Sequence, residues 1–505
     1  MNAGQIVPPQ GFRTLCTHDD IQWYDAVATE GGYSNFQFVD DHYESEHTVR
    51  RIFSLARKLG FKSFCIETVL PDTEWLQEED ANLRLRNCGF KESKVERISF
   101  FGTDVTRAKR GLMSPKEYIG YVVVKKDICE SAKNSPLYVY ESVLPTCRDE
   151  KLTFLHCCRQ YQVQYRFGTF SVTGALYAQQ NGLTFVCAHV ALRSVLSLVL
   201  DNGDISYAEI NKLAGISVSD GDIGLGKGMS PFQLEEVLRK KGVAFREIGN
   251  EPGKNKGLRQ DYSRYLYGFT ESNCPSLLTF KTKGPRHAMP VVGHTFNEDM
   301  WPPDADSYFI DKNEHYSSER WMGSFLTHDD NFGPYLCLPK KYLDDTPVMI
   351  YGLSMERDAL GFDKAEFVAS DWFNMFAKTV MSWPNADWYN RFVVYARHKM
   401  LVLRPVLVDK STYLHHLPKS SSTTILERLE SLPETFWVVE ASFPELFSGT
   451  RAKVGDAVLS CRLDENFSGK VDPILLCLPG LIYFHGDSEI TPFGNDYHRP
   501  LLKNH

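Results

Sequence analysis

The chain of 505 residues is longer than one hydrophobic core usually grows, so we expect several domains. Hydrophobic residues make up 43% of it and charged residues 24%, which is typical of a soluble globular protein. The net charge of −8 and the lack of a long Lys/Arg cluster argue against a nucleic-acid partner. The apolar stretches are too short for a membrane span and the amino terminus lacks the features of a secretory signal, so we expect a cytoplasmic protein with no membrane partner.

Residues 1–130 alternate helix-like and strand-like runs. Residues 45–60 carry apolar side chains at helical spacing, and residues 61–68 and 118–126 have the composition of strands. We therefore predict a small N-terminal α/β domain. The following residues, 131–174, are rich in β-forming side chains and are predicted to be a β-rich connector.

Helix starts are clearly marked between residues 175 and 345. Ser206 and Ser230 each precede a helical pattern, with Glu209 and Gln233 three positions later, which is the spacing of a capping box. These helices alternate with strand-like runs, so this segment is predicted to be a central α+β domain.

Residues 346–505 begin with an aromatic-rich helical pattern and continue with short strand-like runs. A C-terminal domain of helices and a small antiparallel sheet or barrel is predicted. The chain as a whole is therefore expected to be an α+β protein in which two domains flank a central one.

Twelve cysteines are scattered through the chain without regular spacing. This pattern is typical of reduced thiols in an intracellular protein, most of them packed in the core. The sequence His-Cys-Cys at 156–158 is the nearest to a metal motif, but adjacent residues cannot easily share one tetrahedral ion and no second ligand pair has the required spacing. We predict no metal and no cofactor.

One cysteine lies where an irregular segment becomes an apolar, helix-periodic run. Cys187 opens that run, so we expect it in the first turn of a buried helix. The helix dipole and the unbonded amides at a helix start stabilise an anion, which favours a thiolate nucleophile. Burial in an apolar core would act in the opposite direction and leave a packing residue, the commoner use of a lone cysteine. His189, two residues later, would point away from Cys187 and is predicted to be structural.

A histidine and an aspartate farther along the chain favour the catalytic alternative. His287 opens a short apolar run, and a strand there would hold its imidazole in one orientation, as a general base requires. A second strand-like run, 307–311, ends in Asp311. If the two strands are antiparallel neighbours, Asp311 reaches the imidazole and fixes its tautomer. Asp304 and Asp306, in the preceding turn, are the competitors for this role.

The order of these elements resembles that of the papain-like double-glycine leader peptidases, the bacterial cysteine proteases of bacteriocin export. The matching segments are the Cys187 helix, the helix-loop-helix and strand block at 204–248, "HAMPVVGH" at 287–294 and "SYFID" at 307–311. Together they lie within residues 180–315, about a quarter of the chain. The resemblance implies a papain-like fold for residues 175–345 and a peptide or protein substrate.

The family also has a glutamine shortly before its cysteine as an oxyanion donor. Gln180 is the candidate for that role, with Gln179 or Asn181 as substitutes. The expected activity is hydrolysis of a peptide or isopeptide bond through a thioester. In it Cys187 attacks, His287 transfers the proton, the carboxylate of Asp311 orients His287, and Gln180 with the Cys187 amide binds the oxyanion.

Two other functions remain open. Transglutaminase-like and arylamine acetyltransferase-like enzymes use the same three residue types in the same order for acyl transfer, and an inactive papain-like module could serve as an interaction domain or sensor. The flanking domains are expected to select the substrate or a partner protein. The segment 327–335 contains a histidine and two aspartates, but its turn-forming residues predict a loop or a wall of the substrate cleft.

Overall fold

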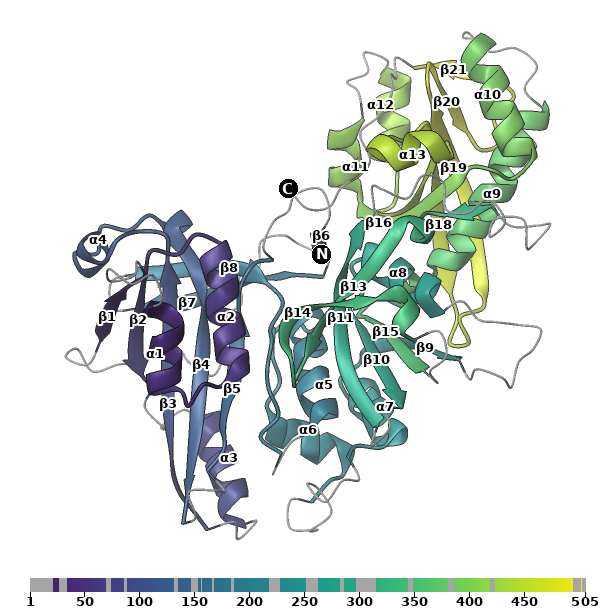
Figure 1. The fold of residues 1–505 in the computed structure, drawn as a ribbon. Coiled ribbons are helices and arrows are strands. Elements are labelled where there is room, and N and C mark those ends of the chain that lie inside the picture. Colours follow the sequence, from purple (N-terminus) through teal and green to yellow (C-terminus); the bar gives the residue numbers. More distant parts are fainter. Residues whose placement is uncertain are drawn as a thin grey trace.

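The computed structural model describes most of the chain: residues 21–26, 34–69, 74–85, 89–130, 135–146, 153–155, 157–165, 168–182, 186–217, 228–250, 262–281, 286–296, 315–343, 348–379, 386–417, 423–493 and 501. It contains both helices and strands, in agreement with the predicted α+β class. Three sheet-containing parts follow one another along the chain, drawn in purple and blue, in teal, and in green to yellow in Figure 1.

The N-terminal domain is a five-stranded antiparallel sheet in the order β1-β2-β3-β4-β5. The last strand lies beyond the expected boundary at residue 130, because it pairs with β4 and completes the sheet. Helices α1 and α2 pack on one face and α3 on the other. The elements are β1 (Gln22–Asp25), α1 (Ser34–His42), α2 (His47–Lys58), β2 (Ser63–Thr68), α3 (Glu74–Leu85), β3 (Phe90–Phe101), α4 (Val105–Lys109), the 3₁₀ helix η1 (Pro115–Glu117), β4 (Tyr118–Cys129) and β5 (Leu137–Val143).

Helix α2 confirms the helix expected at residues 45–60. Glu46 caps its start, with Oε2 accepting the N–H of Val49 at 2.8 Å. Its buried residues recur at helical spacing, so one side of the helix packs on the sheet and the other is left for the central domain.

The central domain is a second antiparallel sheet, in the order β14-β13-β11-β10-β15-β9, with β6 pairing on β11. A hairpin of β7 and β8 precedes its first helix. The N-caps predicted at Ser206 and Ser230 are confirmed. The elements are β6 (Thr153–Leu155), β7 (Arg159–Tyr165), β8 (Gly168–Gly174), α5 (Cys187–Val199), α6 (Tyr207–Ala214), α7 (Pro231–Lys240), β9 (Ala244–Asn250), α8 (Tyr262–Glu271), β10 (Ser276–Lys281), β11 (Arg286–Phe296), β13 (Met322–Asp329), β14 (Gly333–Pro339), η5 (Lys340–Leu343) and β15 (Val348–Ser354).

The C-terminal domain is built on an open seven-stranded sheet in the order β12-β16-β17-β18-β19-β20-β21, in which only the β12–β16 pair is parallel among the described strands. The elements are β12 (Tyr316–Ser317), η4 (Ser318–Trp321), η6 (Arg357–Leu360), α9 (Phe362–Thr379), α10 (Ala386–Arg397), β16 (Val402–Asp409), α11 (Lys410–His416), α12 (Thr423–Glu430), β17 (Thr435–Ser442), α13 (Pro444–Thr450), β18 (Gly455–Leu463), β19 (Gly469–Leu478), β20 (Leu481–Phe484) and β21 (Thr491–Pro492).

Shared cores join the three parts. One core combines α5, α6 and α7 with side chains of the N-terminal sheet, the β7–β8 hairpin and one side of the central sheet. Another combines α8 and α9 with the central and C-terminal sheets. Helix α5 is therefore packed between the N-terminal and central sheets, and this position decides what surrounds Cys187.

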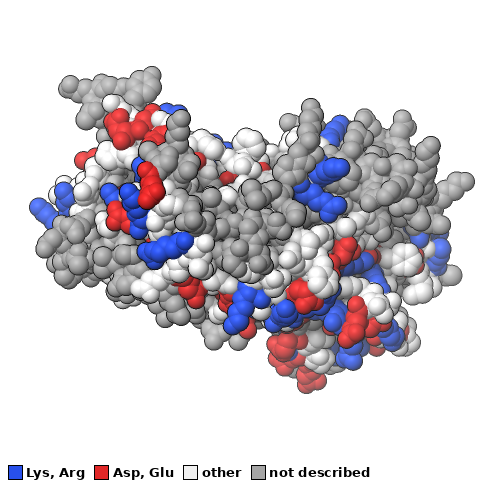
Figure 2. Space-filling view, turned by 90° about the horizontal axis from the view of Figure 1, so that it is seen from below, with Lys and Arg blue, Asp and Glu red and all other residues white. Residues whose placement is uncertain are grey.

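The surface drawn in Figure 2 carries acidic and basic side chains of the described residues side by side. The described residues of that face therefore form no patch of one sign. Among the described helices, none has both the length and the apolar character needed to cross a bilayer.

Candidate functional site

Cys187 is the first residue of α5, as the sequence predicts. The preceding residue, Val186, is extended (φ −123°, ψ 178°) and provides no side-chain cap, and the first amide to bond its carbonyl is that of His189 at 2.8 Å. The amides of Cys187 and Ala188 therefore lie before the first backbone bond of the helix and are oriented toward an anion at its start. Most of α5 is buried, whereas the Cys187 side chain is partly exposed, so the thiol lies at an accessible end of a rigid helix.

His287, on β11, is placed beside this thiol. The Cys187 Sγ lies 4.0 Å from the carbonyl oxygen of Arg286, the residue before His287, and the side chain of Cys187 is one of the groups that raise the pKa of His287. The other side of the ring meets a carboxylate, since Nε2 lies 3.1 Å from Oδ2 of Asp329. Because Nε2 is engaged by Asp329, Nδ1 is the ring nitrogen available to Cys187.

A second carboxylate approaches the same nitrogen. Asp330 Oδ1 lies 3.5 Å from His287 Nε2. The side chains of His287, Asp329 and Asp330 are only 14%, 4% and 3% exposed, so the imidazole has acidic neighbours in a largely desolvated site.

Burial and charge act against each other on these groups. Burial lowers the pKa of His287, but the hydrogen bonds to Asp329 and Cys187 and the charges of both carboxylates raise it to about 10. Burial raises the pKa of Asp329, yet the bond to His287 and two backbone amides lower it further than burial raises it. For Asp330, burial dominates and the pKa rises to about 6. At neutral pH the site therefore contains an imidazolium next to Cys187 and an ionised Asp329.

Asp329 reaches His287 because β13 runs antiparallel to β11 and ends beside the start of β11. A register irregularity between Thr327 and Asp329 occurs at the point where the chain leaves the ladder. Beyond it, Oδ1 of Asp329 accepts the backbone N–H groups of Asn331 at 2.8 Å and Phe332 at 3.1 Å. The carboxylate is thus fixed by its own turn on one side and bonds the imidazole with its other oxygen.

Residues 327–335 form the end of β13, a tight turn and the start of β14, so only the central part of the segment is the loop that the sequence predicted. The carboxylate that meets His287 among the described residues is Asp329, which the sequence analysis did not select. Asp311 and its competitors Asp304 and Asp306 lie outside the described residues. The available signal was the hairpin pattern: β-forming residues, then Asp-Asp-Asn-Phe-Gly, then β-forming residues again.

Gln180 lies in the segment that follows β8 and leads toward α5, with a half-buried side chain. Its neighbour Gln179 is already engaged by the N-terminal domain, because its side-chain oxygen accepts the N–H of Val139 at 2.9 Å and its nitrogen donates to Glu46 at 3.3 Å. Asn181 is buried, at 7% exposure. Gln180 therefore stays the predicted oxyanion donor, and Gln179 is the weaker substitute.

Replacing Gln180 by alanine is expected to reduce turnover by roughly a hundredfold and leave KM nearly unchanged, as expected when one oxyanion donor is lost. Steady-state kinetics on a cleavable peptide check this. The matched comparison is Gln179→Ala, which should lower the melting temperature through its lost bonds to Val139 and Glu46 more than it lowers turnover. A large turnover loss in Gln179→Ala beside a silent Gln180→Ala would move the oxyanion role one residue back.

His189 is completely buried and its Nε2 lies 2.8 Å from Asn211 Oδ1 on α6. Burial lowers its pKa to about 4, so it is neutral at physiological pH. This location agrees with the structural role predicted for it.

His287, Asp329 and Asp330 also have the chemistry of a metal site. Their ligand atoms, one nitrogen and two oxygens, all lie within 4.8 Å of one another. Imidazole and carboxylate ligands suit a divalent cation such as Zn²⁺ or Mn²⁺. A cation bound there would replace the Nε2 proton that His287 otherwise donates to Asp329, so metal binding and the Cys187–His287 pair are competing uses of one imidazole.

A cavity among the described residues lies elsewhere. It measures about 440 Å³ and is lined by residues of α8, α9 and β19, together with His315. None of its lining residues belongs to the Cys187 group. A bond that reacted with the thiol would have to lie within contact distance of it, at the open end of α5 and not in this cavity.

No family model, curated protein or solved structure matches the chain.

Proposed function

We propose that the protein is a papain-like cysteine peptidase that hydrolyses a peptide or isopeptide bond. The observation that carries the proposal is the arrangement at the start of α5: Cys187 at the helix N-terminus, His287 beside it, and the buried Asp329 within hydrogen-bond distance of His287 Nε2. Nucleophile, base and orienting group in this relation define a catalytic triad by geometry, whatever their order in the chain. The cytoplasmic location belongs to the same proposal. It is supported by the nine described cysteines, none of which forms a disulfide with another described cysteine.

The proposed reaction has two steps. In the first, the Cys187 thiolate attacks the carbonyl carbon, the C–N bond breaks, and His287 gives its proton to the departing amine. In the second, water attacks the thioester carbon and gives a proton to His287, the C–S bond breaks, and the acid product leaves with the thiolate restored. The Cys187 amide and the Gln180 side chain would hold the oxyanion in both steps.

Each described residue has a physical reason for its role. The bond from His287 to Asp329 fixes the orientation of the ring and leaves Nδ1 available to the thiol, and the negative charge stabilises the imidazolium. Asp330 adds a second negative potential at the same nitrogen when it is ionised. The helix start stabilises the thiolate, and the bulk of α5 keeps it in position.

Product analysis on a peptide library prepared from a whole proteome tests the proposal. Incubation in water should produce new amino termini, and addition of an excess of a primary amine should leave the products unchanged. Products that carry the added amine, with little hydrolysis, would instead support acyl transfer. Failure of any bond to break, with Cys187 inert to thiol reagents, would support a non-catalytic interaction module.

A metal-dependent reaction is the second candidate, because the His287, Asp329 and Asp330 group offers three ligand atoms within 4.8 Å. A chelator separates the two candidates. The cysteine mechanism predicts cleavage that EDTA leaves intact and that added Zn²⁺ inhibits by taking the imidazole. Cleavage that EDTA abolishes and a divalent cation restores would support the metal candidate.

A further inference from the structure

Elements of the N-terminal domain contact both halves of the candidate site: the Asp329 turn and the Cys187 helix. We propose that this domain is a working part of the catalytic centre, in which Arg51 is a positioning residue for Asp329. The inference rests on the proposed function, because it assumes that Asp329 orients His287. It extends that function by naming a residue in another domain on which the reaction depends.

Arg51, on α2, reaches across the turn between β13 and β14. Its Nε donates to the carbonyl oxygen of Pro334 and its Nη2 to that of Tyr335, both at 2.8 Å. Its aliphatic stem lies on Gly333, where an added Cβ would come within 2.6 Å of the Arg51 Cδ. Gly333 also has a φ of +99°, a conformation that favours glycine. Helix and turn are therefore in direct contact.

The rest of the turn is held in the same way. His47 lies one helical turn before Arg51 on α2, and its Nε2 bonds the carbonyl oxygen of Asn331. Tyr335 has a left-handed φ of +53°, which a non-glycine residue adopts only when its surroundings enforce it. Its hydroxyl donates to the carbonyl oxygen of Leu144 at 2.5 Å, just beyond β5.

These contacts determine where the catalytic carboxylate lies. The amides of Asn331 and Phe332 bond one oxygen of Asp329, and the other oxygen bonds His287. A displacement of the turn moves those two amides, and Asp329 moves with them. Small displacements of this kind at supporting residues are known to weaken catalysis strongly.

The Cys187 helix is tied to the same domain. Arg193 lies on α5, and its Nη2 bonds both Glu141 on β5 and Asp204, the latter at 2.9 Å. Its Nη1 also donates to the carbonyl oxygen of Tyr140 at 3.2 Å. Arg193 and Glu141 are each only 1% exposed. A buried ion pair often stabilises a fold no more than well-packed apolar side chains would. The pair of Arg193 and Glu141 is therefore better explained as a contact that fixes the position of α5 relative to β5.

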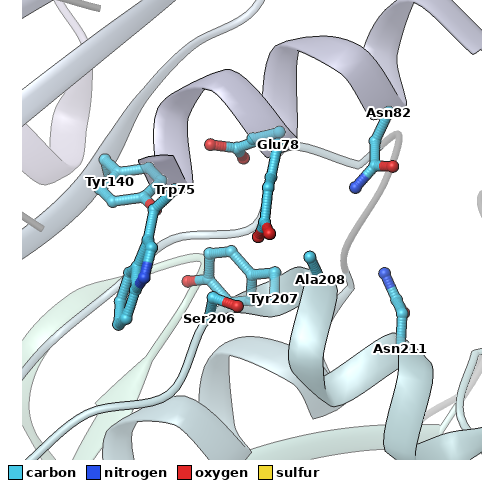
Figure 3. A pocket seen from close by; sticks show the side chains of 9 residues that line it. Trp75, Glu78, Asn82, Tyr140, Ser206, Tyr207, Ala208 and Asn211 are labelled. Atoms are coloured by element: carbon cyan, nitrogen blue, oxygen red, sulfur yellow. The ribbon is translucent and has the colours of Figure 1, made fainter. Parts of the chain in front are cut away.

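The seam between the two domains is tightly closed beside this ion pair. The side chains around it come from α3 and β5 on one side and from the start of α6 on the other, as Figure 3 shows: Trp75, Glu78, Asn82 and Tyr140, facing Ser206, Tyr207, Ala208 and Asn211. The cavity among them measures about 10 Å³, close to the smallest that admits one water molecule. The N-terminal domain is thus packed on the central domain and not merely linked to it.

The test compares three variants of the full chain on helix α2. Arg51→Ala removes both bonds to the turn, and Arg51→Lys keeps the charge and one donor group. Arg50→Ala is the matched control, because Arg50 is also an arginine of α2 and forms its ion pair with Asp40 on α1, at 2.7 Å. Thermal unfolding reports the stability of each variant. The rate of iodoacetamide incorporation at Cys187 as a function of pH reports the site.

The alkaline step of that profile reports loss of the imidazolium proton of His287. Among the described residues, the charged and titratable groups facing His287 are Cys187 on α5, Asp329 at the end of β13 and Asp330 in the turn that follows it. In the unmodified protein the step is expected at a pH of about 10. Loss of a neighbouring carboxylate shifts such a step by about one to three pH units, so Arg51→Ala should lower it by about one unit. Arg51→Lys should recover part of the shift, and Arg50→Ala should leave the step in place.

An alkaline step in folded Arg51→Ala that coincides with that of the unmodified protein would overturn the proposal. So would equal shifts in Arg51→Ala and Arg50→Ala, because these would report general loosening of α2. The proposed function fails in a different way: the unmodified protein would show no His287-dependent step at Cys187 at all.

Discussion

Replacing His287 by alanine is expected to reduce turnover by about four orders of magnitude, the loss typical of removing one member of a catalytic triad. In this variant, the rate of Cys187 alkylation should also depend on pH in the way that the rate of an ordinary thiol does. Such a thiol reacts only as its thiolate, so the rate falls about tenfold for each pH unit below about 8.5. The measurement is the rate of iodoacetamide incorporation at Cys187 between about pH 5 and pH 9, followed by mass spectrometry.

The unmodified protein should behave differently over the same range. The folded-state pKa of His287 is raised from 6.5 to about 10, so the imidazolium is fully present below pH 6.5 and is lost only as the pH rises through about 10. A plateau through neutral pH is therefore expected. His398→Ala, at an exposed position on the C-terminal domain, is the control and should leave the profile unchanged. Equal profiles for His287→Ala and the unmodified protein would show that Cys187 is not paired with His287.

Replacing Asp329 by asparagine is expected to reduce turnover by about a hundredfold. An amide still bonds the ring, but it cannot stabilise the imidazolium with a full charge. The loss should be smaller than in serine enzymes, where the same change costs about four orders of magnitude, because a thiolate paired with imidazolium depends less on its third member. The alkaline step of the Cys187 profile should also move down, by about one to three pH units, since an opposite charge beside His287 is lost.

Asp311→Asn is the comparison that decides between the two aspartates. The strand-order prediction gives the orienting role to Asp311, and the described geometry gives it to Asp329. A large loss in Asp329→Asn with Asp311→Asn close to full activity is the expected result. The reverse result would return the role to Asp311, and full activity in both would leave a Cys187–His287 dyad.

Local features of the fold could be predicted from the sequence because neighbouring residues encode them. Apolar spacing and a capping residue were enough to predict the helix at residues 45–60 and the caps at Ser206 and Ser230. The helix that begins at Cys187 could be found in the same way, because an apolar periodic run starts there.

The orienting carboxylate could not be selected in this way, because the pairing of β13 with β11 is a long-range contact. An antiparallel neighbour of the strand that carries His287 must end where that strand begins. Strand β13 is such a neighbour, and its last residue, Asp329, meets His287. Nothing local in the sequence states which strand is that neighbour. The Asp-rich turn at 329–332 was therefore interpreted as a loop, although the same residues are what a hairpin turn requires.

The role of the N-terminal domain was beyond sequence reasoning for a related reason. The bonds from Arg51 to Pro334 and Tyr335 join residues that are 283 and 284 positions apart. The pair of Arg193 and Glu141 joins two domains through side chains that are ordinary in their local context. Only the folded arrangement places both beside the candidate site.

Competition between two cysteines for one reagent tests the central claim most directly. Cys337 is exposed, whereas Cys187 is only partly exposed, and partial burial raises the pKa of the Cys337 thiol above its ordinary value. The folded protein is treated with a limiting amount of iodoacetamide at neutral pH and the labelled cysteines are mapped by mass spectrometry. If Cys187 is an activated nucleophile, it should be labelled first although Cys337 is more accessible. Labelling in order of exposure, with Cys337 modified and Cys187 intact, would contradict the account.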